Sequence, residues 1–199
     1  MKRTFDVFVA GAGVVVLLPL FLLLAWLVRI SMGSPVLFTQ LRVGLWGRDF
    51  TLFKFRTMTV RRGADQGTFD VGDRTRVTRM GKILRKTKLD ELPQLWNVIR
   101  GDMSLVGPRP EVRKWVEAFP SRWKTVLTVR PGITDPAAIE FRNEEELLVA
   151  VPDPEAYYRD VVLSRKLDLY EQYVKTRSFW GDVGILFRTI GVVVGKTKV

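Results

Sequence analysis

Neither cysteine nor histidine occurs among the 199 residues of the chain. Their absence excludes disulfides, zinc sites built from thiolates and imidazoles, and nucleophiles activated by a histidine base. Acidic residues are few as well: 21 Asp and Glu stand against 32 Lys and Arg, so the net charge is +11. Any bound metal should therefore be a hard cation held by oxygen atoms. The positive charge favours anionic partners, namely nucleic acid, anionic lipid or phosphorylated small molecules.

Long apolar runs are also scarce, and the one present, residues 7–28, contains no charged residue. A straight helix of this length would match the hydrocarbon thickness of a membrane. A signal peptide fits poorly because the run is too long and no small-residue cleavage site follows it. Pro19 predicts a kink near its middle. Basic residues flank both ends, which favours a hairpin that enters and leaves by one face, while a spanning helix stays an alternative.

The remaining sequence predicts a mixed α/β fold that is predominantly helical. Residues 35–60 alternate around two glycines and predict a small β-hairpin, and residues 61–79 are polar and predict a loop. Residues 80–100 have helical spacing with a break near residues 89–93, and Gly101 fits the end of that helix.

Two later stretches have apolar residues at helical spacing with basic neighbours, residues 112–119 and 180–194. Such stripes are ordinary core in most proteins. They also suit amphipathic helices that lie in the plane of a membrane interface, and both readings stay open. Between them, residues 143–178 are expected to be helical.

The acidic pair Asp90–Glu91 stands out, because eight basic residues and no other acid lie between residues 74 and 100. Pro93 is tolerated only in the first turn of a helix, which puts the pair at a helix N-terminus. Asp90 could simply cap that helix. Alternatively, the helix terminus lowers its pKa, and the ionised carboxylate attacks phosphorus without a base. Mg²⁺ and the surrounding cations would then offset its repulsion of a phosphate.

Two loops have the chemistry of a phosphate-binding cradle. Prolines on both sides of Arg109 give its guanidinium a stiff mount. Pro131-Gly132 fits the centre of a type II turn and places Arg130 at its entry.

The order of these features resembles the bacterial sugar transferases, the small monotopic phosphoglycosyl transferases that begin glycan assembly on a membrane lipid. The resemblance rests on the apolar segment with an internal proline, KFRTM (54–58), LDELPQLWNVIRGDMSLVGPRP (89–110) and RPGIT (130–134). It covers nearly the whole chain, and the second motif is long and specific. Leu18 is a departure, since the family often has serine before this proline.

The resemblance implies transfer of a sugar-1-phosphate from a UDP-sugar to polyprenyl (undecaprenyl) phosphate, with release of UMP. This would be the first membrane step in the assembly of a bacterial glycoconjugate. Asp90 would be the nucleophile that forms a covalent phosphoglycosyl-aspartate, and Asp90 and Glu91 would bind Mg²⁺. Basic residues in and near the motifs are expected to bind the substrate phosphates: Lys54, Arg56, Arg85, Arg109 and Arg130.

The implied organisation is a re-entrant membrane helix over residues 1–33 and a cytoplasmic catalytic domain over residues 34–199. We expect a monotopic protein on the cytoplasmic leaflet of the bacterial inner membrane, with amphipathic interfacial helices and no nucleic-acid partner. A homodimer is one option for its oligomeric state. Residues 61–79 and 135–150, judged irregular and near the motifs, are the candidates for selecting the sugar.

Two other classes of protein are compatible with parts of the sequence. One is a membrane-tethered basic adaptor that binds nucleic acid or anionic lipid by charge. The other is a single-pass protein with an extracytoplasmic domain. The Asp90–Glu91 pair argues against the adaptor, which has no use for two carboxylates among cations, and a cytosolic UDP-sugar argues against the second.

Overall fold

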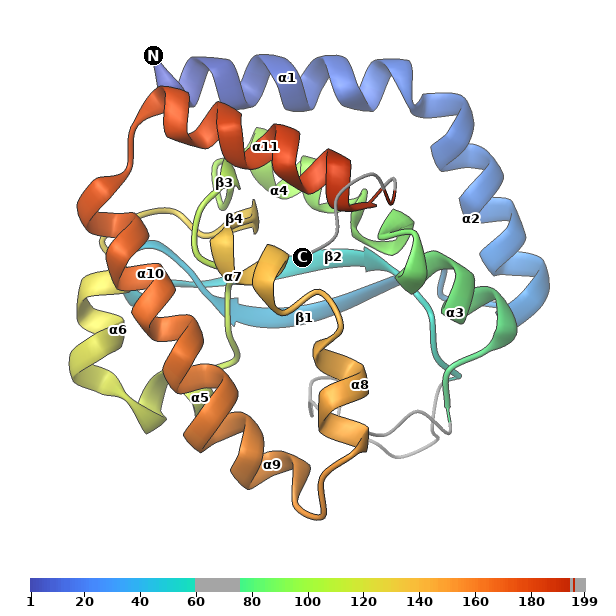
Figure 1. Ribbon diagram of the computed structural model, residues 1–199. Coiled ribbons are helices and arrows are strands. Elements are labelled where there is room, and N and C mark those ends of the chain that lie inside the picture. Colours follow the sequence, from blue (N-terminus) through green and yellow to red (C-terminus); the bar gives the residue numbers. More distant parts are fainter. Residues whose placement is uncertain (60–75, 194, 196–199) are drawn as a thin grey trace. The chain divides into compact units, whose positions relative to one another are not determined.

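The computed structural model describes residues 1–59, 76–193 and 195. It is mixed α/β and mostly helical, as predicted (Figure 1). The chain forms two compact units. Among the described residues, the N-terminal unit contains 1–41, 51–59 and 76–103, and the C-terminal unit contains 42–50, 104–193 and 195. The boundary predicted at residue 33 is of another kind: it divides residues expected in the membrane from residues expected in the cytoplasm. It stays a prediction.

The apolar segment forms two helices, α1 (Lys2–Val16) and α2 (Leu18–Met32), which bend by 64° at Leu17 (Figure 1). Pro19 lies in the first turn of α2, where its missing N–H is not needed. The N–H of Leu17 donates to Gly13 O and its carbonyl accepts from Phe21 N, both at 2.9 Å, so the break keeps its hydrogen bonds. The predicted kink is confirmed. Among the described residues no single helix is long and apolar enough to cross a membrane, although the bent pair together is.

Both ends of the bent pair are bound to the rest of the N-terminal unit. Arg3 donates to the carbonyls of Ile99 and Met103, at 3.2 and 3.3 Å, where α4 (Gln94–Arg100) ends. At the other end Arg56 donates to three successive carbonyls where α2 ends, those of Met32, Gly33 and Ser34. Both ends of the bent pair are therefore attached to the unit to which the pair itself belongs.

The predicted β-hairpin is confirmed as β1 (Leu37–Val43) and β2 (Asp49–Phe55), an antiparallel pair. The short turn η1 (Leu45–Gly47) connects the strands. Trp46 and Gly47 both have positive φ there, 57° and 74°. The far end of each strand belongs to the N-terminal unit, and the turn belongs to the C-terminal unit.

The predicted broken helix is also confirmed. It consists of α3 (Arg79–Lys86), the 3₁₀ turn η2 (Leu89–Glu91) and α4. Thr78 begins α3 by accepting a hydrogen bond from Gly81 N at 3.0 Å. Gly101 ends α4 with φ of 97°, a conformation that glycine adopts without strain. Of the loop predicted over residues 61–79, residues 61–75 lie outside the described residues, and α3 already begins at Arg79.

The C-terminal unit contains a parallel strand pair that the sequence did not predict. In it, β3 (Ser104–Val106) pairs with β4 (Gly132–Thr134), with Ser104 opposite Gly132. The backbone after β3 approaches the start of β4 so closely that a Cβ on Gly132 would lie 2.1 Å from the backbone nitrogen of Gly107. Glycine is therefore required there, and the approach places the Pro108–Pro110 loop beside the RPGIT motif.

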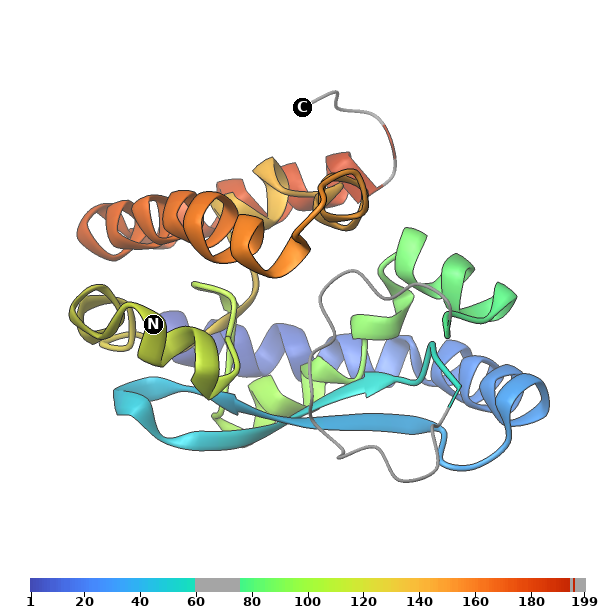
Figure 2. The same cartoon turned by 90° about the horizontal axis from the view of Figure 1, so that it is seen from below.

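Helices make up the rest of this unit. In order they are α5 (Arg113–Ala118), α6 (Pro120–Val126), α7 (Pro136–Glu140), α8 (Glu144–Val149), α9 (Pro154–Tyr157), the π-helical η3 (Tyr158–Leu163), α10 (Ser164–Thr176) and α11 (Phe179–Val193). The segments α9, η3 and α10 run as one rod in both ribbon views (Figures 1 and 2). The helical prediction for residues 143–178 is confirmed. Residues 135–150, expected to be irregular, instead contain α7 and α8.

The two apolar stripes have different environments. Trp115 and Val116 of α5 are buried in the core of the C-terminal unit, together with Trp123 and Tyr158. The first stripe is therefore core. On α11, by contrast, Trp180, Phe187 and Ile190 are exposed, which keeps the interfacial reading open for the second stripe.

Candidate active site

The acidic pair lies in a tight turn between two helices. Asp90 and Glu91 belong to η2, and α4 begins three residues after Glu91 with Pro93 as its N-cap residue. The pair thus directly precedes a helix start, close to where the sequence placed it. Lys88 enters the turn with φ of 57°, a left-handed conformation that is rare outside glycine. Such strain often occurs at functional sites.

Strand β2 supplies the nearest cation to this pair. Lys54 Nζ lies 3.1 Å from Glu91 Oε1, and both side chains are largely buried. A partly buried ion pair fixes both groups more firmly than a surface pair does. The structure therefore brings together three of the predicted site residues, Lys54, Asp90 and Glu91.

Asp90 is only 6% exposed. Within the described part of the chain, its buried Oδ1 has no hydrogen-bond partner. Burial raises the pKa of Asp90, and the charge of Glu91 raises it further; Lys54, Lys88 and Arg85 act in the opposite direction. The sequence argument, which had the helix terminus lower this pKa, is wrong in sign because removal from water outweighs the neighbouring cations.

The basic residues of the N-terminal unit are used in different ways. Arg85 acts electrostatically on Asp90, and its Nε donates to Thr57 Oγ1 at 3.0 Å. Arg56 is buried, and its guanidinium binds the carbonyls that end α2. Its Nη1 and Nη2 donate to these carbonyls, while its buried Nε has no partner among the described residues. Phosphate binding by Arg56 stays a prediction. Lys88 was not among the predicted site residues, although its position two residues before Asp90 was a usable signal.

Arg109 and Arg130 belong to the C-terminal unit. Arg109 acts electrostatically on two fully buried groups, the carboxyl of Asp135 and the hydroxyl of Tyr170. Burial raises the pKa of Asp135 to about 6, although Ala138 N–H, Arg109 and Lys166 favour its charged form. Phosphate binding by Arg109 and Arg130 stays a prediction.

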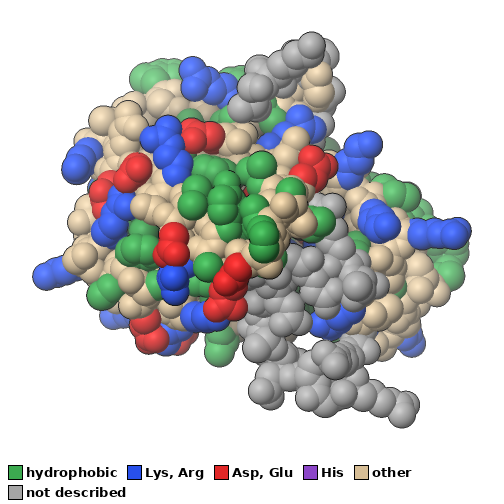
Figure 3. Space-filling view, turned by 60° about the horizontal axis from the view of Figure 1, so that its bottom comes forward, with side chains coloured by type: hydrophobic (Ala, Val, Ile, Leu, Met, Phe, Trp, Pro, Cys, Tyr) green, Lys and Arg blue, Asp and Glu red, His purple; other side chains and the backbone are tan. Residues whose placement is uncertain are grey.

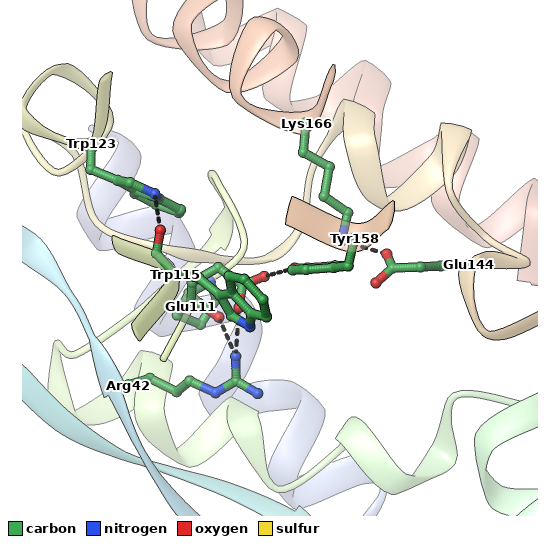
Figure 4. A network of polar contacts seen from close by, with 8 residues as sticks. Arg42, Glu111, Trp115, Trp123, Glu144, Tyr158 and Lys166 are labelled. Atoms are coloured by element: carbon green, nitrogen blue, oxygen red, sulfur yellow. Dashed lines mark hydrogen bonds and ion pairs between the residues drawn. The ribbon is translucent and has the colours of Figure 1, made fainter. Parts of the chain in front are cut away.

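A buried polar network supports the loop that contains Arg109 (Figure 4). Arg42 donates to the carbonyl of Pro110 at 3.0 Å and to Glu111 Oε2 at 3.1 Å, and Tyr158 OH donates to Glu111 Oε1 at 2.6 Å. Lys166 pairs with Glu144 and lies 5.1 Å from the centroid of the Tyr158 ring. Sequence analysis missed this network because its members are scattered over more than 120 residues without a shared motif.

The oxygen atoms available for a metal are few. In the part of the chain that the structure describes, no three acidic side chains converge. Asp90 and Glu91 nevertheless fit Mg²⁺, which proteins often bind through one or two carboxylates together with substrate phosphates. The unpartnered Oδ1 of Asp90 is consistent with such a ligand.

Comparison with known proteins reveals clear relatives. The family model for bacterial sugar transferases matches residues 1–196. A UDP-N-acetylgalactosamine-undecaprenyl-phosphate N-acetylgalactosaminephosphotransferase of Aeromonas hydrophila is 37% identical over 98% of the chain and 44% of its own length. A UDP-glucose:undecaprenyl-phosphate glucose-1-phosphate transferase of Caulobacter vibrioides is 37% identical over 95% of the chain and 68% of its own.

The uncharacterized sugar transferase EpsL of Bacillus subtilis is 37% identical over 98% of the chain and 87% of its own length. Several relatives are much longer: the chain spans 39–44% of the length of four of them, the Aeromonas protein included. The match to the family model and to a relative of similar length settles the family. The chain belongs to the bacterial sugar transferase family.

Proposed function

We propose that the chain transfers a sugar-1-phosphate from a UDP-sugar to polyprenyl phosphate, undecaprenyl phosphate in particular, and releases UMP. The observation that carries the proposal is the buried Asp90 beside the Glu91–Lys54 pair, in a chain of this family. The relatives from Aeromonas and Caulobacter are named for such a transfer to undecaprenyl phosphate.

The reaction has two displacements at one phosphorus atom. A carboxylate oxygen of Asp90 forms a bond to the β-phosphorus, and the bond from that phosphorus to the bridging oxygen breaks, so UMP leaves with the electron pair. A phosphate oxygen of the lipid then attacks the same phosphorus and releases the carboxylate of Asp90. The two nucleophiles are the carboxylate of Asp90 and the phosphate of the lipid, and in their ionised forms neither has a proton that a base must remove. The absence of histidine is therefore no obstacle.

The cations around Asp90 make this chemistry feasible. Lys54, Lys88 and Arg85 all favour the ionised form of Asp90, and they also neutralise a bound diphosphate. Mg²⁺, held by Asp90 and Glu91, would supply further charge neutralisation when bound. Glu91 would then have two roles, as a ligand and as the partner that holds Lys54.

We also propose that α1 and α2 form a re-entrant membrane hairpin with both ends at the cytoplasmic face. Eight large apolar side chains of the pair are at least half exposed, more than a soluble protein normally leaves in water: Phe8, Val15, Val16, Leu18, Leu22, Leu23, Trp26 and Ile30. Arg3 and Arg56 bind the two ends to the unit that contains Asp90. A hairpin held in this way has its ends on one side of a membrane.

The exposed residues of α11 extend the proposed membrane contact. Trp180 is 78% exposed and Phe187 is 72% exposed, with Arg188 beside them. Aromatic side chains next to a basic one suit a helix that lies in the interface of an anionic leaflet. On the face in Figure 3, basic side chains are interspersed with acidic and apolar ones rather than gathered in one patch, which does not favour a purely electrostatic adaptor.

The test is a UMP-release assay with purified protein, polyprenyl phosphate, Mg²⁺ and a panel of UDP-sugars. We expect release with at least one sugar, and none with Asp90→Asn. Binding of anionic vesicles by a protein that releases no UMP with any sugar would contradict the enzyme and support the adaptor.

A further inference from the structure

Two buried amide side chains on α4 have opposite environments. Asn97 is fully buried and fully bonded: its Nδ2 donates to Thr51 O at 2.7 Å, and its Oδ1 accepts from Phe53 N at 3.1 Å. Gln94, three residues earlier, is 1% exposed, yet its Nε2 has no hydrogen-bond partner among the described residues. Asn97 thus attaches α4 to β2, whereas the buried Nε2 of Gln94 has no bond within the described ranges that would explain the polar side chain.

The position of Gln94 relates it to the acidic pair. Several backbone bonds through η2 and at the start of α4 run i→i−3, such as Glu91 N to Lys88 O and Leu95 N to Leu92 O. In 3₁₀ and α-helical turns alike, residues three apart lie on the same side, so Gln94 follows Glu91 on one side of the segment. Asp90 lies next to this line, and its Oδ1 is likewise buried and unpartnered.

An unsatisfied buried amide destabilises a fold, and an apolar side chain of the same size would not. Native proteins contain few such groups, and those that persist commonly have a catalytic or ligand-binding reason. Here an unpaired donor and an unpaired acceptor lie within five residues of each other. A phosphorylated ligand bound at Asp90 would bring acceptor oxygens, and one of these would satisfy the Nε2 donor of Gln94.

We propose that the side-chain amide of Gln94 donates a hydrogen bond to a phosphoryl oxygen of the substrate while Asp90 attacks the phosphorus. This inference rests on the function proposed above and adds a residue to it. An uncharged donor can stabilise the negative charge on that oxygen without forming an ion pair with Asp90 or Glu91, as the donors of an oxyanion hole do. By this account Gln94 is a catalytic residue and Asn97 a structural one.

The test compares Gln94→Met with the matched control Asn97→Leu, in the full chain. Gln94→Met keeps the length of the side chain and removes only the amide. We expect its thermal midpoint to equal or exceed that of the wild type, while the single-turnover rate of UMP release falls about 100-fold. The concentration of Mg²⁺ at half-saturation should not change. Asn97→Leu should instead lower the thermal midpoint, because two bonds to β2 are lost.

Two other results would overturn the inference. One is a Gln94→Met rate within a few-fold of the wild type. The other is a loss of rate that saturating Mg²⁺ restores, which would make Gln94 a metal ligand. Should Gln94→Met fail to fold, Gln94→Ala, which also lacks the donor, must show the same loss of rate. Wild type and Asp90→Asn, assayed beside these variants, test the proposed function separately, since its failure would abolish the wild-type signal itself.

Discussion

The buried carboxyl of Asp135 should make the stability of the protein depend on pH in a measurable way. Its Oδ1 begins α7 by accepting a hydrogen bond from Ala138 N at 2.9 Å, while the buried Oδ2 has no partner among the described residues. In Asp135→Asn the amide oxygen can still accept the bond from Ala138. The substitution therefore removes the buried charge and keeps the helix cap.

The size of the effect follows from the pKa values. Burial raises the pKa of Asp135 from 3.8 to about 6. At about 1.4 kcal/mol per pH unit, this difference corresponds to about 3 kcal/mol. Well below pH 4 the carboxyl is protonated in both the folded and the unfolded chain, so its ionisation contributes nothing. Between about pH 4 and pH 6 the unfolded chain loses this proton first, and the wild type becomes less stable relative to Asp135→Asn.

The assay is urea unfolding followed by tryptophan fluorescence from pH 4 to pH 8, with the detergent held constant. Trp115 and Trp123 are buried in the same unit and report its unfolding. We expect the free energy of unfolding of the wild type to fall by about 3 kcal/mol relative to the variant over this range. Asp153→Asn is the matched control, because Asp153 caps α9 through Ala156 N in the same way but is exposed. A difference between wild type and Asp135→Asn that does not change with pH would refute the reasoning.

Three further predictions concern the N-terminal unit. Asp90→Asn should abolish UMP release, and it should unfold no more easily than the wild type at neutral pH, because burial raises the pKa of Asp90 and disfavours its charge; residual turnover in a pure sample would remove Asp90 as the nucleophile. Glu91→Gln should lower activity by at least ten-fold and raise the Mg²⁺ needed for half-saturation, since it removes a carboxylate and frees Lys54; an unchanged Mg²⁺ titration would exclude Glu91 from the metal site. Pro19→Ala should straighten the 64° bend and move some molecules into a spanning topology. A single cysteine at position 2 tests this in intact cells: labelling by an impermeant thiol reagent should appear in Pro19→Ala only, and labelling without that change would contradict the hairpin.

Local signals in the sequence predicted much of the N-terminal unit. Proline and glycine constrain the backbone of their immediate neighbours, whatever the rest of the chain does. This holds for Pro19 at the start of α2, for the glycines between β1 and β2, and for Gly101 after α4. The motif around Asp90 and Glu91 is continuous, so its place between two helices was readable as well.

Features that depend on distant residues were not predictable. The β3–β4 pair joins two three-residue strands 28 positions apart in register, and neither strand is long enough to show a period. Burial reversed the direction of the pKa prediction for Asp90, and burial is a property of the folded unit. The contacts of Arg56 with the carbonyls at the end of α2 were not predictable either, because 22 to 24 residues separate the partners.

The most direct test of the central claim is to trap the covalent intermediate. Purified protein is incubated with the UDP-sugar that gives UMP release, labelled in its sugar, with Mg²⁺ and without lipid acceptor. After denaturation and peptide mapping, the account predicts label on the peptide that contains Asp90, discharged to lipid when polyprenyl phosphate is added before denaturation, and absent from Asp90→Asn. Formation of product only when both substrates are present, with no labelled peptide at any time, would contradict it and indicate a direct transfer between the two substrates.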